Sequence, residues 1–454
     1  MITSIPWWQN AIFYHIYPLG FCGALQRNDF QSAPVERLEK VSAWIPHLRD
    51  LGVNALYIGP LFESTYHGYD TADYTQVDRR LGSNRGLADL TWTLHENGIH
   101  VIFDAVFNHV GRNFFAFRDV QQHGSASQYC GWFDGLRFDG HSPYGDPFTY
   151  QGWNGNYDLV KLNLGNPAVR KHLFNAVRGW VDEFGVDGLR LDAADCLDAD
   201  FIKELRRFTT TLKPDFWLMG EIVAGDYRRM ANPDMLHSVT NYECYKGLWS
   251  SLVDKNYFEI AWSLNRQFGV DGLYRDLPLY NFADNHDVDR VASSLGDPAL
   301  LYPLYCLLFT MPGVPSVYYG SEWGLQGKRT RTDDSALRPC LELDALAQSA
   351  PQAELPMVIR RLADLRQSSP ALSIGGYAQL LVSHQQFAFL REYPEERVVV
   401  ALNASAEAAQ VIIDLPFAAT RARDLLNPSA EISVVSNKLA IEVPPRWARV
   451  MILK

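Results

Sequence analysis

The sequence has few of the features that mark a metal, redox, nucleic-acid or membrane protein. Its six cysteines, at positions 22, 130, 196, 244, 306 and 340, form no CxxC pair and no zinc-like cluster, so neither a metal site nor a redox motif is indicated. Lys and Arg number 41 against 52 Asp and Glu, a net charge of −11. An acidic chain is a poor partner for nucleic acid or anionic lipid. A neutral small-molecule substrate is therefore expected.

The chain also has no recognisable signal peptide or membrane-spanning segment. Its first residues, MITSIPWWQNAIFYHIYP, have no basic start, apolar core or small-residue cleavage site, and we expect a cytoplasmic protein with free thiols. An uncharged run at 298–321 is interrupted by Pro303, Pro312 and Pro315. This run predicts a buried helix near 301–311 and a buried strand near 315–320, not a membrane span.

A helix–glycine–strand pattern repeats along the chain. Amphipathic segments at 36–51, 84–97 and 166–184 each end at a glycine, and an apolar stretch follows each one. Asn166 is placed to cap the third of these helices, and Pro167 to occupy its first position. The pattern indicates parallel βα units whose sheet is covered on both faces.

Eight strands are predicted in all. They lie at 12–18, 53–60, 99–106, 186–193, 216–223, 237–243, 279–285 and 315–321. Eight strands separated by helical patterns predict a (β/α)8 TIM barrel, an α/β fold. A doubly wound open sheet is the alternative, but it normally carries a Gly-rich phosphate loop after its first strand, and none is present here.

Two regions depart from this rhythm and predict further domains. Residues 110–165, between the third and fourth strands, are rich in Gly, Asp, Tyr, Trp and Asn, and are expected to form an inserted domain B that walls the substrate site. Residues 372–454 contain short strand-like segments and are expected to form an antiparallel β-sandwich. The barrel then comprises 1–109 and 166–371.

Polar residues gather at the predicted carboxyl ends of four strands. The segments are DAVFNH (104–109), GLRLDAAD (188–195), GEI (220–222) and NFADNHD (281–287). Because active sites of such barrels lie at these ends, Asp192, Glu221 and Asp287 should converge on one mouth.

A pair of catalytic carboxylates with a third acidic residue nearby is typical of enzymes that hydrolyse glycosides. The charge of Arg190 is expected to keep Asp192 ionised and nucleophilic. The apolar run before Glu221 should favour its protonated form, which a proton donor needs. Asp287 is expected to accept hydrogen bonds from sugar hydroxyls. Asp104 is expected to pair with Arg190 or cap a loop, with no chemistry assigned.

Each of these residues taken singly has a structural interpretation, because most strand-end Asp residues are caps and most lone His residues are core. The co-occurrence of four polar clusters on four strand ends favours catalysis. These segments resemble the four conserved regions of the α-amylase family of glycoside hydrolases (family 13), in the same order. HGYDTADY (67–74) and DRRLGS (78–83) are similar to the family's stretch after the second strand.

LVKLN (159–163) resembles the MPKLN segment of the family's neopullulanase/cyclomaltodextrinase branch. That branch usually has an N-terminal β domain. Since this chain begins almost at the first predicted barrel strand, we expect that domain to be absent.

The resemblance implies a retaining mechanism, with Asp192 as nucleophile, Glu221 as acid/base and Asp287 as the residue that binds the distorted sugar. By position in the family's motifs, the implied substrate-binding residues are Tyr69, His109, Arg190, His286 and Arg338.

Four aromatic side chains of the insertion, Trp132, Phe133, Trp153 and Tyr157, are further candidates for sugar contact. No cofactor is expected to be required. Asn108 retains a calcium ligand of the family, but nothing in the insertion completes an oxygen cage, so a calcium requirement is doubtful.

The function expected is hydrolysis of α-1,4 bonds in maltodextrins, cyclomaltodextrins or related short or cyclic α-glucans. Whether α-1,6 bonds are also cleaved is not decided by the sequence. The first alternative is a 4-α-glucanotransferase on the same substrates, since the motifs do not decide whether water or a sugar reaches the intermediate. A remote alternative is a non-catalytic glucan-binding protein. The presence of all three carboxylates disfavours this alternative. A homodimer, chain-length preference and endo or exo action stay open.

Overall fold

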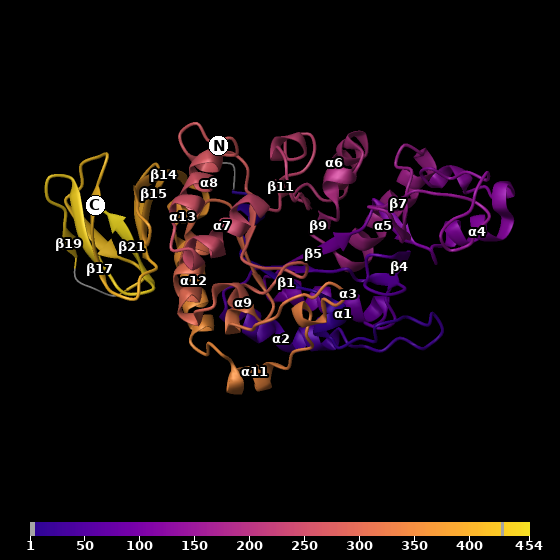
Figure 1. The fold of residues 1–454 in the computed structure, drawn as a ribbon, viewed down its shortest axis with the longest axis horizontal. Helices are drawn as coiled ribbons and strands as arrows, with labels where there is room; N and C mark the ends of the chain where they lie inside the picture. The colour runs from indigo at the N-terminus through magenta and orange to yellow at the C-terminus, as the bar shows by residue number, and fades with distance from the viewer. Residues whose placement is uncertain (1–4, 428–430) are drawn as a thin grey trace.

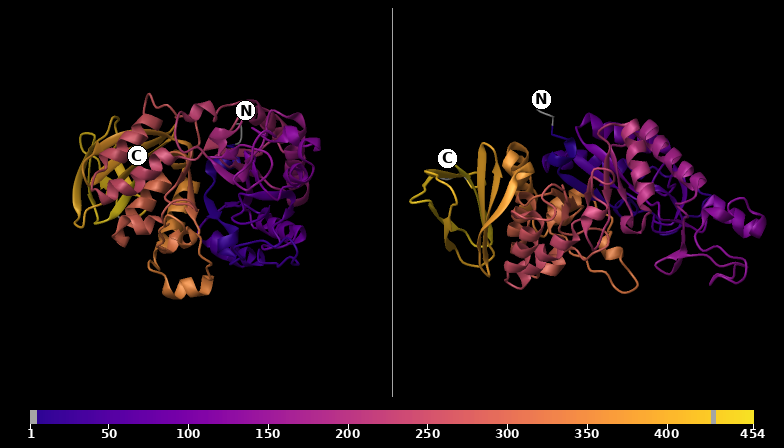
Figure 2. Two further views of the ribbon diagram at one scale, coloured as in Figure 1. Left: turned by 45° about the vertical axis from the view of Figure 1, so that its right-hand side comes forward. Right: turned by 90° about the horizontal axis from the view of Figure 1, so that it is seen from above.

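The computed structural model describes residues 5–427 and 431–454. Figure 1 shows a central barrel with the C-terminal strands at one end and the segment around α4 and β7 at the other. The same order along the long axis is seen from above in Figure 2. The molecule is therefore elongated, with the barrel between two smaller parts.

Eight parallel strands form the barrel, in the order β11-β10-β9-β5-β2-β1-β13-β12. A parallel bridge between Thr240 and Tyr280 joins the two ends of this sheet and closes it. Each predicted strand is present and the barrel fold is confirmed. The strands are β1 Phe13–Ile16, β2 Ala55–Ile58, β5 His100–Ala105, β9 Gly188–Leu191, β10 Trp217–Gly220, β11 Ser238–Val239, β12 Tyr280–Phe282 and β13 Val314–Tyr318.

The three predicted amphipathic helices cover the barrel. They are α2 Glu39–Asp50, α3 Asn84–Glu96 and α5 Pro167–Phe184. Asn166 caps α5 by accepting a hydrogen bond from the N–H of Ala168, and Gly185 ends it in the left-handed conformation, as the sequence predicts. The other helices are α1 Pro18–Phe21, α6 Ala199–Leu212, α7 Tyr242–Val253, α8 Phe258–Phe268, α9 Val291–Leu295, α10 Leu301–Thr310, α11 Leu343–Ser349, α12 Leu355–Ser368 and α13 Pro370–Ile374.

The uncharged run at 298–321 forms the buried helix α10 followed by β13, as predicted. Among the described residues, no helix is both long and apolar enough to cross a membrane.

Large side chains fill the inside of the barrel. The Phe13 and Trp217 rings stack with their centroids 5.0 Å apart, and Tyr280 packs edge-on against Phe13. Because these side chains fill the interior, polar groups can gather only at the ends of the strands. The site must therefore lie at a barrel mouth.

Two long segments are inserted after the carboxyl ends of β2 and β5. The first is the hairpin β3 Phe62–Ser64 and β4 Thr71–Val77. The second contains α4 Phe115–His123 and a three-stranded antiparallel sheet, β6 His109–Gly111, β8 Asn156–Lys161 and β7 Gly152–Trp153. Both are wall-building segments beside the mouth.

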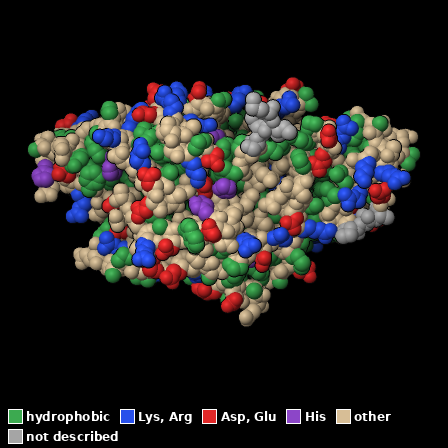
Figure 3. Space-filling model, turned by 180° about the vertical axis from the view of Figure 1, so that it is seen from behind, with side chains coloured by type: hydrophobic (Ala, Val, Ile, Leu, Met, Phe, Trp, Pro, Cys, Tyr) green, Lys and Arg blue, Asp and Glu red, His purple; other side chains and the backbone are tan. Residues whose placement is uncertain are grey.

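The C-terminal part is an antiparallel sandwich, as predicted. A six-stranded sheet in the order β14-β15-β16-β21-β18-β19 shares a core with the two-stranded sheet β17-β20. Its strands are β14 Gly376–Val382, β15 Gln386–Tyr393, β16 Glu396–Asn403, β17 Ala409–Asp414, β18 Arg421–Asp424, β19 Ile432–Ser433, β20 Lys438–Val443 and β21 Trp447–Leu453. On the face opposite the view of Figure 1, acidic and basic side chains are interspersed (Figure 3).

Candidate active site

The three candidate carboxylates lie at the carboxyl ends of three barrel strands. Asp192 directly follows β9, Glu221 directly follows β10, and Asp287 lies in the loop after β12. The Asp192 N–H donates to the carbonyl of Ala105 over 3.1 Å, and the Glu221 N–H donates to the carbonyl of Leu191 over 2.9 Å. These bonds continue the sheet hydrogen bonding into the site, so the two backbones are held rigidly.

Arg190 is the centre of the site. Its Nη1 lies 2.8 Å from Asp192 Oδ1 and 2.8 Å from Asp104 Oδ1, and its Nη2 lies 2.9 Å from Glu221 Oε2. Asp104 and Arg190 are register partners on neighbouring strands. Of the two roles expected for Asp104, the ion pair with Arg190 is the one observed.

Burial and the neighbouring charges act on the pKa of Asp192 in opposite directions. Burial raises the pKa of Asp192 well above its ordinary value; Arg190 opposes the rise, and the Glu221 and Asp104 carboxylates add to it. One guanidinium serves three carboxylates, so the expectation that Arg190 keeps Asp192 ionised stays a prediction.

An unusual backbone turn directs a second donor to Glu221. Ala193 adopts φ +43°, in the left-handed region that non-glycine residues rarely occupy, and its N–H donates to Glu221 Oε2 over 3.2 Å. Arg190 contacts the same oxygen. Oε1 is therefore the Glu221 oxygen left for a proton and a substrate atom.

Asp287 is held from two sides. Its Oδ1 accepts from Arg338 over 3.1 Å, and its Oδ2 lies 3.0 Å from His286 Nε2. Burial opposes ionisation, but the nearby charges of His286 and Arg338 lower the pKa of Asp287 below its ordinary value. Arg338 also donates to the His286 carbonyl and lies over the Tyr17 ring. Asp287 is thus a fixed anion at the mouth.

Tyr69 and His109 complete the set of predicted substrate-binding residues. The Tyr69 hydroxyl donates to Asp104 Oδ2 over 3.0 Å, and its ring stacks on His286 with centroids 5.5 Å apart. His109 Nε2 lies 3.9 Å from Asp192 Oδ2. Burial lowers the pKa of His109 to about 3, so its imidazole is neutral and available as a hydrogen-bond donor.

All eight predicted site residues come together at this mouth, and the structure adds positioning residues that were not predicted. Tyr57 on β2 donates to Asp104 Oδ2 over 2.9 Å. Gly59 follows it, and a side chain there would lie 2.3 Å from the Asp104 Cβ, so only glycine allows this approach. No local sequence signal marks Tyr57, because its role depends on a partner 47 residues away.

The aromatic side chains of the insertion mostly fill the insertion itself. Trp132 packs edge-on against Phe115 and Tyr129, and Phe133 is 4% exposed. Tyr157 packs edge-on against Tyr150. Trp153 alone of the four lies at the site: it packs against His109 and lines a cavity of about 340 Å³ that also contains Glu221, Lys161 and Val223.

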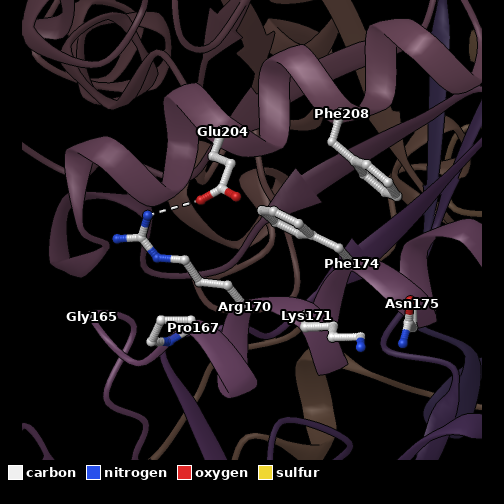
Figure 4. Close-up of a pocket in the computed structure, with 8 residues that line it drawn as sticks. All are labelled: Gly165, Pro167, Arg170, Lys171, Phe174, Asn175, Glu204 and Phe208. Carbon is white, nitrogen blue, oxygen red and sulfur yellow. Dashed lines mark hydrogen bonds and ion pairs between the residues drawn. The ribbon is translucent and has the colours of Figure 1, made fainter.

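A cavity of about 520 Å³ lies elsewhere, between α5 and α6 (Figure 4). Its Arg170 is bound to Glu204 and to Asp198. The stacked rings of Phe174 and Phe208 form one side of it. No strand-end carboxylate lines this cavity, so its groups are structural and the candidate site stays at the barrel mouth.

Asn108 is the possible calcium ligand that the family resemblance implies. The Oδ1 of Asn108 is buried without a hydrogen-bond partner, and the basic residue Lys161 is among those that line the same cavity. Across residues 5–427 and 431–454, no group of three or more His, Cys, Asp or Glu side chains could hold a metal ion.

The chain matches known proteins along nearly its whole length. Residues 16–358 match the alpha amylase catalytic domain, and residues 377–450 match the maltogenic amylase C-terminal domain. A cyclomaltodextrinase from Bacillus sp. is 32% identical over 422 residues, which is 87% of this chain and 73% of the relative.

Comparison with solved structures leads to the same family. The cyclic α-maltosyl-(1→6)-maltose hydrolase of Arthrobacter globiformis superposes with a TM-score of 0.82 at 26% identity, covering 99% of this chain and 100% of that one. The debranching enzyme of Nostoc punctiforme gives 0.81 at 28% identity, with coverage of 99% and 100%. Because the catalytic-domain match spans most of the sequence and the fold agrees over its whole length, the chain belongs to the alpha-amylase family of glycoside hydrolases.

Proposed function

We propose that the protein is a retaining hydrolase of α-glucosidic bonds in maltodextrins, cyclomaltodextrins or related short or cyclic α-glucans. The observation that carries the proposal is the pair Asp192 and Glu221, held on two nitrogens of one guanidinium. Retaining glycosidases need carboxyl groups about 5–5.5 Å apart, closer than inverting enzymes do. Two carboxylates that share Arg190 within hydrogen-bond distance suit the retaining case.

In the first step the Asp192 Oδ2 attacks the anomeric carbon. Its Oδ1 is occupied by Arg190, so Oδ2 is the free nucleophile. Glu221 transfers a proton from Oε1 to the glycosidic oxygen, and the C–O bond breaks to release the leaving sugar. Asp192 attacks as the carboxylate, with its Oδ1 held by Arg190.

In the second step Glu221 takes a proton from water, the water oxygen bonds to the anomeric carbon, and Asp192 is released. Asp287 accepts hydrogen bonds from the 2- and 3-hydroxyls and supports the positive charge that develops on the ring. Tyr69 stacks under the sugar, and His109, His286, Arg190 and Arg338 bind it or hold the groups that do. Every step uses the chain's own residues.

The test is a product profile from maltoheptaose, β-cyclodextrin and pullulan, incubated separately. Opening of the cyclodextrin with accumulation of maltose or glucose is expected. No turnover of any of the three by the wild type would contradict the proposal. Glu221→Gln should retain glucan binding and lose turnover by roughly 10²–10⁴-fold, the usual contribution of a general acid.

Transfer to a sugar is the second candidate. The cavity of about 340 Å³ beside Glu221, walled by Trp153 and Val223, has room for a sugar acceptor where water would otherwise attack. Products longer than the starting maltoheptaose would favour this 4-α-glucanotransferase activity over hydrolysis.

We also propose a cytoplasmic protein that needs no calcium. The free state of all six cysteines supports the location, and the basic residue Lys161 in the cavity that Asn108 lines supports the lack of a calcium requirement. Whether the chain forms a homodimer is tested by light scattering in solution.

A further inference from the structure

A cavity of about 540 Å³ lies beside the last turns of α6, outside the catalytic site. Its lining includes Lys203, Arg206, Arg207, Thr210 and Thr211 of the helix and Asp234 of the segment between β10 and β11. We call it the basal cavity. Its size lies within the usual range of ligand sites.

The basal cavity lies at the end of the barrel opposite the catalytic mouth. Because α6 connects the parallel strands β9 and β10, it runs back from the carboxyl end of one strand to the amino end of the next. Its last turns therefore lie at the amino ends of the strands, whereas Asp192 and Glu221 follow the carboxyl ends. A molecule in this cavity leaves the catalytic mouth free.

Positive charge gathers on the face of α6 that lines the basal cavity. Lys203 and Arg207 are four residues apart and Arg206 is three residues from Lys203, so the three cations lie on one side of the helix. Like charges at these spacings repel and destabilise a helix. Asp200 offsets the charge of Lys203 over 3.2 Å. The two arginines concentrate positive charge in a chain whose net charge is −11.

Both arginines retain free hydrogen-bond donors. Neither forms an ion pair within the part of the chain that the structure describes. The Arg206 Nη1 donates to the Met235 carbonyl and the Arg207 Nε donates to the Lys203 carbonyl, each over 3.3 Å. A guanidinium carries five N–H donors, so most of them have no partner among the described residues. Burial lowers the pKa of Arg206, as expected of a guanidinium without a carboxylate beside it.

The neighbouring face of the same helix shows the more usual arrangement. There Arg170 of α5 binds Glu204 of α6 over 2.9 Å, as Figure 4 shows. It also binds Asp198 over 2.9 Å. The protein itself thus neutralises Arg170, whereas Arg206 and Arg207 are available to an anion from outside.

Two guanidiniums on consecutive residues suit a phosphate group. Arginine donates pairs of hydrogen bonds in a fixed plane, and these match the oxygens of a phosphate. A phosphate group alone is much smaller than the basal cavity. The ligand therefore has room for a further part.

The other polar groups of the cavity indicate what that part is. The Thr210 hydroxyl donates to the Arg206 carbonyl over 2.8 Å, and the Thr211 hydroxyl donates to the Phe208 carbonyl over 2.7 Å. Because their hydrogens are used, both hydroxyl oxygens can only accept hydrogen bonds, as the Asp234 carboxylate does. Hydrogen-bond acceptors beside two cations match a sugar that carries a phosphate.

We propose that the basal cavity is a binding site for a phosphorylated sugar. Arg206 and Arg207 bind the phosphate, and Thr210, Thr211 and Asp234 accept hydrogen bonds from the sugar hydroxyls. The site is separate from the catalytic mouth, so the proposal does not depend on the reaction catalysed there.

Calorimetric titration of the full chain with glucose 6-phosphate tests the proposal, at neutral pH and fixed ionic strength. Saturable binding is expected. The double variant Arg206→Gln/Arg207→Gln should weaken it about tenfold or more, because each substitution removes charge-assisted hydrogen bonds. No binding by the wild type, or equal binding by this variant, would overturn the proposal.

The matched control is Arg360→Gln/Arg361→Gln, which removes the same charge from consecutive arginines of α12, outside the basal cavity. It should bind glucose 6-phosphate as the wild type does. An equal loss of binding in this control would show a general effect of charge and would overturn the assignment to Arg206 and Arg207.

Two further ligands separate the contributions of the phosphate and the sugar. Glucose should bind much more weakly than glucose 6-phosphate, and equal binding would refute the role of the phosphate. Inorganic phosphate should also bind more weakly, and equal affinity would refute the sugar contacts. Asp234→Ala changes an exposed residue and should narrow the difference in affinity between glucose 6-phosphate and inorganic phosphate. An unchanged difference would contradict the contact with Asp234.

Discussion

Asp104→Asn tests the shared-guanidinium arrangement most sharply. Asp104 is 2% exposed and accepts hydrogen bonds from Arg190, Tyr57 and Tyr69 over 2.8, 2.9 and 3.0 Å. Asparagine has nearly the same shape but no charge. A hydrogen bond to a charged group contributes about 1.5–3 kcal/mol, so kcat/KM should fall roughly 10- to 100-fold through displacement of Arg190 and Tyr69.

The same substitution should also shift the pH profile. Burial raises the pKa of Asp192, and the negative charge of Asp104 raises it further. Without that charge, the pKa of Asp192 falls and the nucleophile ionises at lower pH. The acidic limb of kcat/KM, measured with a nitrophenyl α-glycoside, is therefore expected to move to lower pH.

The control is Asp424→Asn in the C-terminal sheet, which removes a buried carboxylate paired with Arg449. It should lower stability without moving the limb. If the Asp104→Asn limb stays in place or moves to higher pH while the protein remains folded, the proposed sharing of Arg190 is wrong.

Three further outcomes are expected. Arg338→Met removes a charge that lowers the pKa of Asp287, so kcat/KM should fall about tenfold or more, most strongly at acidic pH; an unaltered profile would exclude this role. Burial opposes ionisation of Asp187, but hydrogen bonds from His100, His95 and Lys213 lower its pKa. The Asp187 carboxylate therefore stabilises the folded protein at pH values above its pKa in the unfolded chain. This stabilisation is lost as the pH falls through its pKa in the folded protein. Asp187→Asn should cost about 3 kcal/mol in urea unfolding at pH 7 and progressively less below pH 4, whereas a constant difference would contradict the linkage. Dialysis against a chelator should leave Tm and turnover unchanged; a loss restored by calcium would show a site that the described residues do not reveal.

The barrel was predictable because its signals are local. An amphipathic helix, a glycine and an apolar run are all contained within about 25 residues, the length of one βα unit. The strand ends follow directly from those runs, which is why Asp192 and Glu221 could be placed at the mouth before any contact was known. Asp287 was found in the same way, although it lies beyond the last residue of β12.

The contacts between strands were harder to predict. The role of Tyr57 depends on a hydrogen bond between the neighbouring strands β2 and β5, and the position of Tyr66 beside Arg27 brings together two separate loops. The composition of the insertion indicated that its aromatic residues contact the sugar, but Trp132 and Phe133 pack within the insertion's small core. A long insertion needs its own apolar interior, and sequence alone does not separate those side chains from ones that face the substrate.

The central claim is the retaining mechanism, and the anomeric form of the first product tests it most directly. Proton NMR during the first minutes of β-cyclodextrin or maltoheptaose hydrolysis, before mutarotation, would report it. The account predicts that the α-anomer appears first and the β-anomer only later, by mutarotation. Initial formation of the β-anomer would mean direct attack by water, and would contradict the assignment of Asp192 as the nucleophile.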